Sequence, residues 1–533
     1  MTKREDKFSQ KLWKESGRTK EMLKFFSSDA LKSQKEPKPE PELKAYNTAQ
    51  LIGLILGPLL FICVLLFFNA EGLSQKGVYV LAATLWIAVW WITEAIPIPA
   101  TSLMPLFLFP LGGIMDSATV SSAYGDDIIF LFLGGFIIAI AMERWNLHTR
   151  IALVIIKSIG TSTGRILLGF MVATGALSMF VSNTAAVMIM IPIGMAIIKE
   201  ANELTTKDNE KHSLTQFEKS LVLGIGYAGT IGGLGTLIGT PPLIILKGQY
   251  EKLFGEEIGF GQWMVMGVPV VIILLAITWA YLNFVKFKHG MNELPGGKGI
   301  ITKELKALGK TTYEEKVVFT LFCLAAFLWV SREFLLTQLP FTELVKDGTI
   351  SMFIAVLLFL IPAKRKFARI LDWSVAKDLP WGILLLFGGG LSVATAITES
   401  GLDKWMGKQI SGLDGVNIIL IISIVAIFVL FLTEITSNTA TATMILPILA
   451  TIAVGIHVHP LALMIPAAMA ANCAFMLPVG TPPNAIVFGT DKVTIREMAT
   501  AGFWLNLISC VVIVVFVLLM VPWLFGIDLL ATK

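Results

Sequence analysis

The tetrapeptide Ser-Asn-Thr-Ala occurs twice in this sequence, at 182–185 and 437–440, and each copy is followed by Gly-Thr-Pro-Pro, at 239–242 and 480–483. The hydroxyl and amide groups of the first motif offer neutral oxygens to hard cations and N–H and O–H donors to a carboxylate. In the second motif the prolines cannot continue a helix, and the glycine lets the backbone approach a ligand closely. The doubled pattern predicts a binding site built from two copies of one structural unit, as in transporters.

The composition determines which elements can carry these motifs. Of the 533 residues, 55% are hydrophobic and 15% are charged, whereas an ordinary soluble domain has about 25% charged residues. Many stretches of about twenty residues have almost no charge and are long enough to cross a bilayer as helices. We therefore expect an all-α polytopic membrane protein.

Two apolar stretches, 165–199 and 416–456, are too long for one crossing and carry Ser-Asn-Thr in the middle. Thirty-five helical residues would span roughly 50 Å, against about 30 Å of hydrocarbon. We therefore interpret both as re-entrant hairpins with Ser-Asn-Thr at the tip. Non-helical backbone at that depth must face protein or a water-filled cavity.

Counting both stretches as hairpins leaves eleven transmembrane helices, one of which is expected at 96–115. With a cytoplasmic N-terminus and an outside C-terminus, 34 of the 42 Lys and Arg residues fall on the cytoplasmic side, as the positive-inside rule requires. Each half then contains five crossings and one hairpin. An odd number of crossings inverts the second half, which predicts two inverted repeats.

The predicted organisation has five parts. They are a basic cytoplasmic tail with 12 Lys and Arg (1–47), a first transmembrane helix (48–76), repeat 1 (77–290, with hairpin 165–199 and broken helix 219–247), a cytoplasmic connector (291–314) and repeat 2 (315–527, with hairpin 416–456 and broken helix 460–489). The tail orients and solubilises the chain, and a role at the membrane surface is the alternative.

The cysteines and histidines are not spaced like the ligands of a metal site. The four cysteines lie singly in apolar segments, which favours unpaired packing residues over disulfides. His457 and His459 lie two apart in a short loop and do not share a helix face. We therefore expect neither a disulfide framework nor a metal centre.

Glu434 is the acid nearest to a tip. We interpret it as a packing carboxylate satisfied by backbone donors, with direct cation binding as the alternative. An intramembrane hydrolase is a distant functional alternative, because no nucleophile–base pair or metal set lies within the apolar segments.

The paired motifs, together with Trp-Trp-Ile-Thr-Glu-Ala-Ile-Pro-Ile-Pro at 90–99, resemble the divalent anion:sodium symporter family over residues 48–526. The likeness is greatest to sodium-dependent dicarboxylate transporters of Gram-positive cocci. It implies symport of sodium and C4-dicarboxylates (succinate, fumarate, malate) into the cell by an elevator mechanism, in a homodimer within the cell membrane. It implies no cofactor beyond Na⁺ as coupling ion, and no nucleic-acid partner.

The resemblance also implies the site residues. These are Ser178, Ser182, Asn183 and the backbone of Gly239 for a first sodium, and Thr433, the carbonyl of Thr436, Asn438 and the backbone of Gly480 for a second. For the substrate they are Asn183, Thr184, Asn438, Thr439, Thr481 and Pro482. At the first break Leu243 stands where family members often have asparagine. A sodium-independent exchanger, or a sulfate or citrate carrier on the same fold, would share most of these motifs.

Neither tip carries a Lys or Arg residue. A dianion is costly to bring to the middle of a membrane unaccompanied. Bound sodium can supply the missing positive charge, so that ion and anion binding depend on each other. We expect sodium to bind first and complete the anion site.

Overall fold

The structure is a computed structural model that describes residues 46–529 except 161, 206–207, 292, 296, 333–343, 365–367 and 411–416. Within these residues the regular elements are helices, apart from two isolated antiparallel bridges. The described residues from Ala49 onward form one compact unit. The basic tail expected at 1–47 lies outside the described residues except for its last two. The expected all-α class is confirmed.

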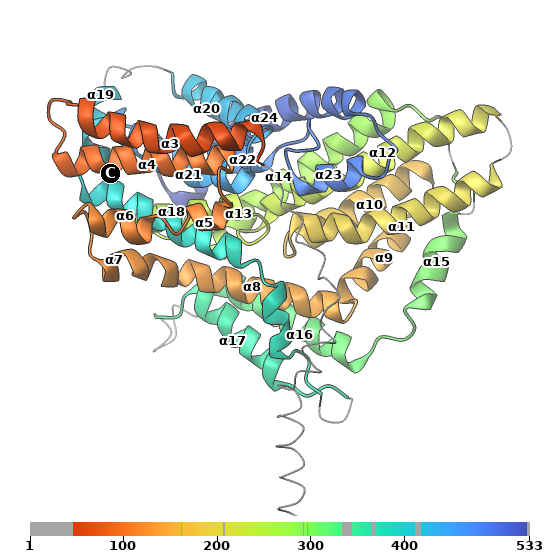
Figure 1. Ribbon diagram of the computed structural model, residues 1–533. Helices are drawn as coiled ribbons and strands as arrows, with labels where there is room; N and C mark the ends of the chain where they lie inside the picture. Colours follow the sequence, from red (N-terminus) through yellow and green to blue (C-terminus); the bar gives the residue numbers. More distant parts are fainter. Residues whose placement is uncertain are drawn as a thin grey trace, which may run out of the picture. The chain divides into compact units, whose positions relative to one another are not determined.

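The helices of the first half are drawn from red to green in Figure 1. They are α3 (Thr48–Phe67), α4 (Gln75–Thr93), α5 (Ile98–Thr101), α6 (Pro105–Leu111), α7 (Ser117–Ser122), the 3-10 turn η1 (Ala123–Gly125), α8 (Asp127–Arg144), α9 (Leu147–Ile159), α10 (Thr163–Ser178), α11 (Asn183–Leu204), α12 (Asp208–Gly232), the 3-10 turn η2 (Gly233–Gly235), α13 (Pro241–Phe254), α14 (Phe260–Ala280) and the π-helical turn η3 (Tyr281–Lys286).

The helices of the connector and the second half follow, from green to blue. They are α15 (Gly297–Ala307), α16 (Tyr313–Ser331), α17 (Asp347–Leu360), the 3-10 helix η5 (Trp373–Asp378), α18 (Trp381–Glu399), α19 (Leu402–Ile410), α20 (Ile418–Thr433), α21 (Asn438–Gly455), α22 (Leu461–Asn472), α23 (Pro482–Phe488) and α24 (Ile495–Phe525).

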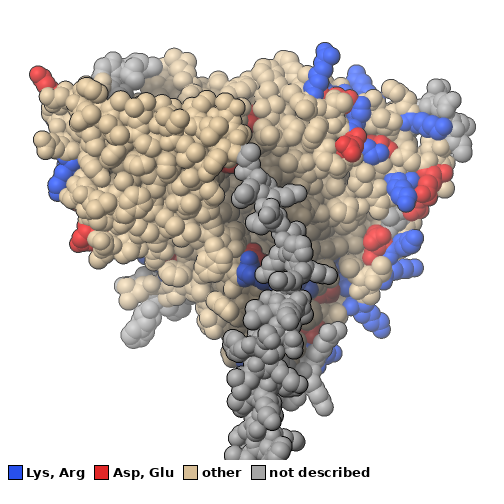
Figure 2. Space-filling model, viewed as in Figure 1, with Lys and Arg blue, Asp and Glu red and all other residues tan. Residues whose placement is uncertain are grey.

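Apolar helices long enough to cross a membrane recur throughout the described residues. Eight helical stretches qualify by length and composition, and five apolar stretches are shorter. Figure 2 shows a broad face without charged side chains over the region of α3 and α4, while charged side chains gather near the ends of α11, α12 and α15. These features fit a multi-pass membrane protein. The number of crossings, the re-entrant hairpins and the inversion stay predictions.

Segment 96–115 differs from the single crossing expected there. It forms two short helices, α5 and α6, separated by Ser102–Met104. Pro97 is the N-cap of α5, Pro99 lies in its first turn, and Pro105 begins α6. Proline has no backbone N–H and clashes with a preceding helical turn, so a continuous helix is not available here.

The two halves pack in matching ways. α10 contacts α12 and α14, just as α20 contacts α22 and α24. The contacts between halves are reciprocal: α13 packs against α21 and α22, while α23 packs against α11 and α12. The short helix after each break therefore lies against the helices of the opposite half. Any site at one break is built from both halves.

Candidate functional site

The first Ser-Asn-Thr motif lies between two helices. α10 ends at Ser178 and α11 begins at Asn183, so residues 179–182 form a short connection. The Ser182 hydroxyl accepts a hydrogen bond from the Ala185 N–H at 3.2 Å. This contact caps α11 and satisfies one of the donors that every helix leaves unpaired at its start.

Four oxygen atoms converge beside this connection, and we call them the first oxygen cluster. The Ser178 hydroxyl lies 2.6 Å from Asn183 Oδ1 and 2.6 Å from the Gly229 carbonyl oxygen. The same end of the Asn183 amide lies 3.1 Å from the Gly229 carbonyl oxygen and 3.2 Å from that of Gly239. The structure thus brings together Ser178, Asn183 and Gly239, three of the four residues expected at the first ion site, and adds Gly229.

The first break supplies the close backbone approach that this cluster needs. α12 passes into η2 at Gly233, and helical structure resumes only at Pro241. A Cβ atom on Gly233 would lie 2.6 Å from Asn183 Oδ1, and one on Gly239 would lie 2.6 Å from the Gly233 carbonyl oxygen. The Thr236 hydroxyl donates to the Met179 carbonyl oxygen and so joins the break to the tip. Glycine is required at 233 and 239 because a side chain would occupy the cluster.

The second half repeats this geometry as a second oxygen cluster. α20 ends at Thr433 and α21 begins at Asn438. The Thr433 hydroxyl lies 2.6 Å from Asn438 Oδ1 and 2.9 Å from the Ala471 carbonyl oxygen. Thr433, Asn438 and Ala471 correspond to Ser178, Asn183 and Gly229 of the first half, so both tips join a hydroxyl, an amide and a carbonyl in the same way.

The side chains of Ser182 and Thr436 make other contacts, and Gly480 lies beside Glu434; the backbone roles expected of Thr436 and Gly480 stay predictions. The Ser182 hydroxyl caps α11, as described above. The Thr436 hydroxyl lies 2.7 Å from the Leu432 carbonyl oxygen and 2.6 Å from the Thr441 hydroxyl. Gly480 lies against Glu434, since a Cβ atom at 480 would be 3.1 Å from Glu434 Oε2.

Glu434 holds the second break in shape. Its carboxylate accepts hydrogen bonds from three successive backbone N–H groups, those of Phe475, Met476 and Leu477, at 2.8, 2.9 and 3.1 Å. A fourth comes from Asn506 Nδ2 at 2.7 Å. The side chain is 3% exposed. The interpretation of Glu434 as a packing carboxylate satisfied by backbone donors is confirmed by these contacts.

Asn484 pairs the carbonyl groups of the same unwound segment. Its Nδ2 atom donates to the carbonyl oxygens of Ala474 and Leu477, both at 3.0 Å. Buried backbone groups outside a helix need such partners. Glu434 accepts from the N–H groups of this segment and Asn484 donates to its carbonyl groups, so side chains replace the hydrogen bonds that a helix would have made.

Asn472 was missed by the sequence analysis. It is the last residue of α22 and is fully buried. Its Nδ2 atom donates to the Thr230 carbonyl oxygen at 2.6 Å, and its Oδ1 atom accepts from the Thr240 hydroxyl at 2.7 Å. Asn183 Nδ2 lies 3.3 Å from the same Oδ1. Only one sequence signal pointed to it, namely a single amide in an otherwise apolar helix just before a break.

The residues expected to bind substrate lie at the starts of half-helices. Asn183 and Thr184 begin α11, Asn438 and Thr439 begin α21, and all four are half-buried. The N-terminus of a helix carries a partial positive charge and unpaired N–H groups that favour an anion. Among the described residues, no Lys or Arg side chain forms a hydrogen bond with these four.

Thr481 and Pro482, also expected at the substrate, mark the start of α23. Thr481 is 5% exposed and its hydroxyl accepts from the Asn484 N–H at 3.4 Å, whereas Pro482 is exposed. The structure places these two beside the second break, and among the described residues neither forms a hydrogen bond with either tip.

The described part of the chain contains no group of three or more His, Cys, Asp or Glu residues arranged to hold a metal ion. All four cysteines are unpaired, as expected from their spacing.

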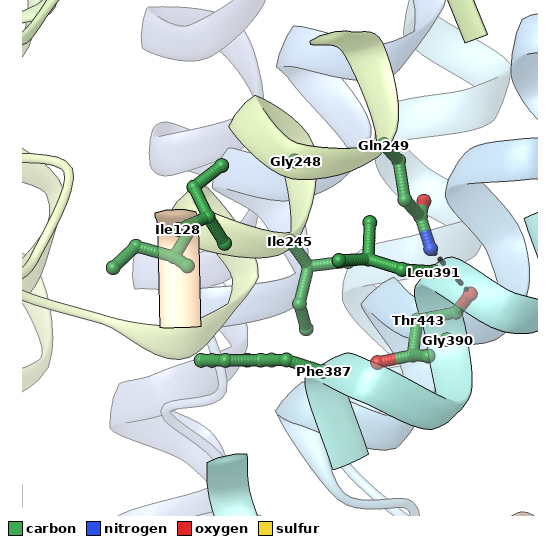
Figure 3. Close-up of a pocket in the computed structure, with 9 residues that line it drawn as sticks. Ile128, Ile245, Gly248, Gln249, Phe387, Gly390, Leu391 and Thr443 are labelled. Atoms are coloured by element: carbon green, nitrogen blue, oxygen red, sulfur yellow. Dashed lines mark hydrogen bonds between the residues drawn. The ribbon is translucent and has the colours of Figure 1, made fainter. Parts of the chain in front are cut away.

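A small enclosed cavity lies between α8, α13, α18 and α21 (Figure 3). Its volume of about 10 Å³ corresponds to one water molecule. Gln249 Nε2 donates to the Thr443 carbonyl oxygen at 3.1 Å beside it, and joins α13 to α21. The cavity is too small for an organic anion and is a feature of the packing between helices.

Comparisons with known proteins show which proteins this chain resembles. The family model described as the sodium:sulfate symporter transmembrane region matches residues 48–527. The chain is 65% identical over 513 residues to the sodium-dependent dicarboxylate transporter SdcS of Staphylococcus saprophyticus, an alignment that covers 96% of this chain and 97% of that protein. It is 64% identical to the transporter of the same name from Staphylococcus aureus, with 96% of each chain covered.

Two solved structures share the fold. The Alcanivorax borkumensis YdaH transporter matches with a TM-score of 0.55 and 11% identity, covering 91% of this chain and all of that one. Neisseria gonorrhoeae MtrF, described as an antimetabolite efflux pump, matches with a TM-score of 0.52 and 13% identity, covering 91% of this chain and 97% of that one. At these identities the likeness concerns the fold alone.

Proposed function

The chain belongs to the family described as the sodium:sulfate symporter transmembrane region, and from this membership we propose that it is a secondary active transporter that carries sodium and a C4-dicarboxylate into the cell together. The proposal assigns a transporter rather than an enzyme. The relatives at 64–65% identity bear the name sodium-dependent dicarboxylate transporter, which supports the choice of dicarboxylate over sulfate. Sodium is cargo and coupling ion, and no cofactor is involved.

The single observation that carries the proposal is the pair of matching oxygen clusters. Ser178, Asn183 and two backbone carbonyls form one, and Thr433, Asn438 and a carbonyl form the other. Hydroxyl, amide and carbonyl oxygens without a carboxylate suit a singly charged hard cation. One sodium ion would bind in each cluster, with the backbone of Gly480 supplying a further oxygen to the second.

The dicarboxylate would bind between the tips. Asn183, Thr184, Asn438 and Thr439 offer side-chain donors at the N-termini of α11 and α21, and Thr481 and Pro482 would form an adjacent wall. These donors are neutral, so the bound sodium ions supply the countercharge of the dianion. Sodium binds first in this scheme, and the two ligands raise each other's affinity.

Movement through the membrane would follow an elevator mechanism. The two tips and two breaks form one transport domain that slides against a scaffold, within a homodimer. Eleven crossings and two re-entrant hairpins place the N-terminus in the cytoplasm and the C-terminus outside. The reciprocal packing of α13 and α23 supports such a domain, because it joins both tips and both breaks in one body.

The test is uptake of radiolabelled succinate into proteoliposomes under an inward sodium gradient, with choline replacing sodium in the control. We expect sodium-dependent accumulation that Asn183→Ala and Asn438→Ala each abolish. Ser423→Ala is a matched control, since its exposed hydroxyl lies in α20 and donates within that helix to the Ile419 carbonyl oxygen. Equal uptake in choline would exclude sodium coupling, and near-normal uptake by both asparagine variants would exclude the tips.

A further inference from the structure

Asn472 is the residue through which the second half of the chain reaches the first oxygen cluster. Its side chain is fully buried, and its three polar contacts are to Thr230, Thr240 and Asn183, all in the first half. Buried polar groups in a membrane protein are expensive unless paired. The stability of α22 alone does not explain why the Asn472 side chain pairs only with residues of the first half.

The orientation of the Asn472 amide is determined by its neighbours. A carbonyl oxygen can only accept, so the atom 2.6 Å from the Thr230 carbonyl oxygen must be Nδ2. The other end, facing the Thr240 hydroxyl at 2.7 Å, is then Oδ1. The Asn183 amide meets this Oδ1 atom at 3.3 Å and must present its own nitrogen there.

The orientation of Asn183 follows from that of Asn472. With its nitrogen on Asn472, the Asn183 oxygen faces the Ser178 hydroxyl and the carbonyl oxygens of Gly229 and Gly239. The reversed amide would place N–H donors 3.1 and 3.2 Å from those two carbonyls, which is favourable locally. However, it would set the Asn183 oxygen against Asn472 Oδ1, and two acceptors repel each other.

We infer that Asn472 is a positioning residue for the first sodium ion: it holds the Asn183 amide so that an oxygen rather than an N–H group points into the first oxygen cluster. This inference rests on the proposed sodium-coupled transport and deepens it. The unreversed amide leaves several oxygens facing one another, an arrangement that a cation between them stabilises. The reversed amide fills the same place with N–H groups and repels a cation.

The same residue links the two ion sites. The carbonyl oxygen of Ala471 belongs to the second oxygen cluster, where it accepts from Thr433 at 2.9 Å, and the next residue is Asn472. A shift of this backbone when the second cluster binds sodium changes the position of the Asn472 side chain on Asn183. Adjacent residues of one chain therefore couple the two sodium ions. The second oxygen cluster has no equivalent of the contact between Asn472 and Asn183, because no described residue accepts a hydrogen bond from Asn438 Nδ2.

The experiment compares wild type with Asn472→Leu, which keeps the size of the side chain and removes its acceptor. Sodium dependence is measured in two ways: as succinate uptake into proteoliposomes, and as sodium-dependent thermal stabilisation of the purified protein without succinate. We expect the half-saturating sodium concentration to rise on the order of tenfold. The Hill coefficient for sodium, bounded by about 2 for two sites, should fall toward 1.

A double variant separates orientation from packing. Both ends of an aspartate side chain are oxygens, so in the Asn183→Asp background the orientation of residue 183 no longer matters. There Asn472→Leu should no longer raise the sodium concentration needed for thermal stabilisation. Ser509→Ala is the packing control, because its buried hydroxyl has no hydrogen-bond partner among the described residues, and it should behave as wild type.

The outcomes are distinct. An unchanged half-saturating sodium concentration and Hill coefficient in Asn472→Leu would overturn the inference, as would an equal loss in the Asn183→Asp background. If Asn472→Leu does not fold, Asn472→Ala is measured against the same expectations. A wild type that neither binds sodium nor needs it for uptake would instead refute the proposed function itself.

Discussion

The Ser178 and Thr433 hydroxyls stand in equivalent places 255 positions apart, each 2.6 Å from Oδ1 of the asparagine five residues further along the chain. Each also contacts a carbonyl oxygen near the end of a helix that breaks, Gly229 in one half and Ala471 in the other. The two halves thus form the same arrangement of three groups. Five predictions follow from the way these groups are held.

Removing either hydroxyl should weaken sodium binding while leaving the fold intact. Ser178→Ala and Thr433→Val each delete one oxygen from one cluster, and we expect the half-saturating sodium concentration to rise on the order of tenfold. Sodium titrations of succinate uptake measure it, with Ser423→Ala as the unaffected control. If only maximal uptake fell, the hydroxyls would have a packing role.

Succinate should stabilise the protein only when sodium is present. The tips contain no basic side chain, so the anion site is complete only when cations are bound, whereas sodium alone has its ligands already. A ligand that binds only the folded state raises the melting temperature, by an amount that grows with the logarithm of its concentration divided by its Kd. We expect stabilisation by sodium alone, a further increase with succinate in sodium, and none with succinate in choline. Stabilisation by succinate in choline would contradict this order.

A methyl group at Gly233 should abolish uptake. The added Cβ atom would lie 2.6 Å from Asn183 Oδ1, closer than real carbon–oxygen contacts allow, and would displace the amide from the first oxygen cluster. Gly125→Ala is the matched control, because a Cβ atom there would meet nothing within 4 Å. Uptake and melting temperature of Gly233→Ala are the measurements, and wild-type uptake would show that the cluster tolerates the shift.

Glu434→Gln should destabilise the second break. The amide keeps the shape of the carboxylate but turns a donor toward one of the four N–H groups that Glu434 now accepts from. An unpaired buried donor costs about 1–3 kcal/mol. We expect a lower melting temperature in detergent. An unchanged melting temperature would mean that these four contacts add little to stability.

Lys247→Met should cost more stability than the same change at a nearby exposed lysine. Lys247 is 1% exposed and pairs with Asp347 at 3.0 Å and Glu257 at 2.5 Å, which joins α13 to the start of α17. Breaking a buried ion pair by removing one partner costs about 3–5 kcal/mol. Arg332 also pairs with Asp347 and Glu257, each at 2.8 Å, so we expect the cost to fall below that range. Lys252→Met, on the exposed face of α13, is the control, and equal melting temperatures of the two variants would contradict the prediction.

Much of the site could be read from residue types and spacing. The repeated Ser-Asn-Thr and Gly-Thr-Pro-Pro motifs lie at helix ends in the structure, since proline and glycine act on the local backbone wherever they occur. Glu434 could be interpreted as a packing carboxylate because few other roles suit a lone acid in an apolar segment. Segment 96–115 was expected as one crossing because it is apolar. It forms two short helices because three prolines interrupt the helical backbone there.

Contacts between distant segments could not be read in this way. Asn472 was missed because its partners, Thr230, Thr240 and Asn183, lie 232 to 289 residues away in the chain. The Ser182 hydroxyl carries the right chemistry for an ion site, yet it caps α11 by accepting from the Ala185 N–H. Residue type alone does not decide between such local and long-range partners.

By itself, the sequence determined that the chain is helical and membrane-spanning, that its two halves repeat, and that breaks occur in matching places, because hydropathy and backbone preference act over a few residues. Tertiary structure alone decided which oxygens meet. Gly229, Ala471 and Asn472 enter the site through backbone atoms or a single amide, and only the packing of α12 and α22 against the tips brings them there. A hydrogen bond depends on atoms within about 3 Å of each other, and distances between remote segments are a property of the packed fold.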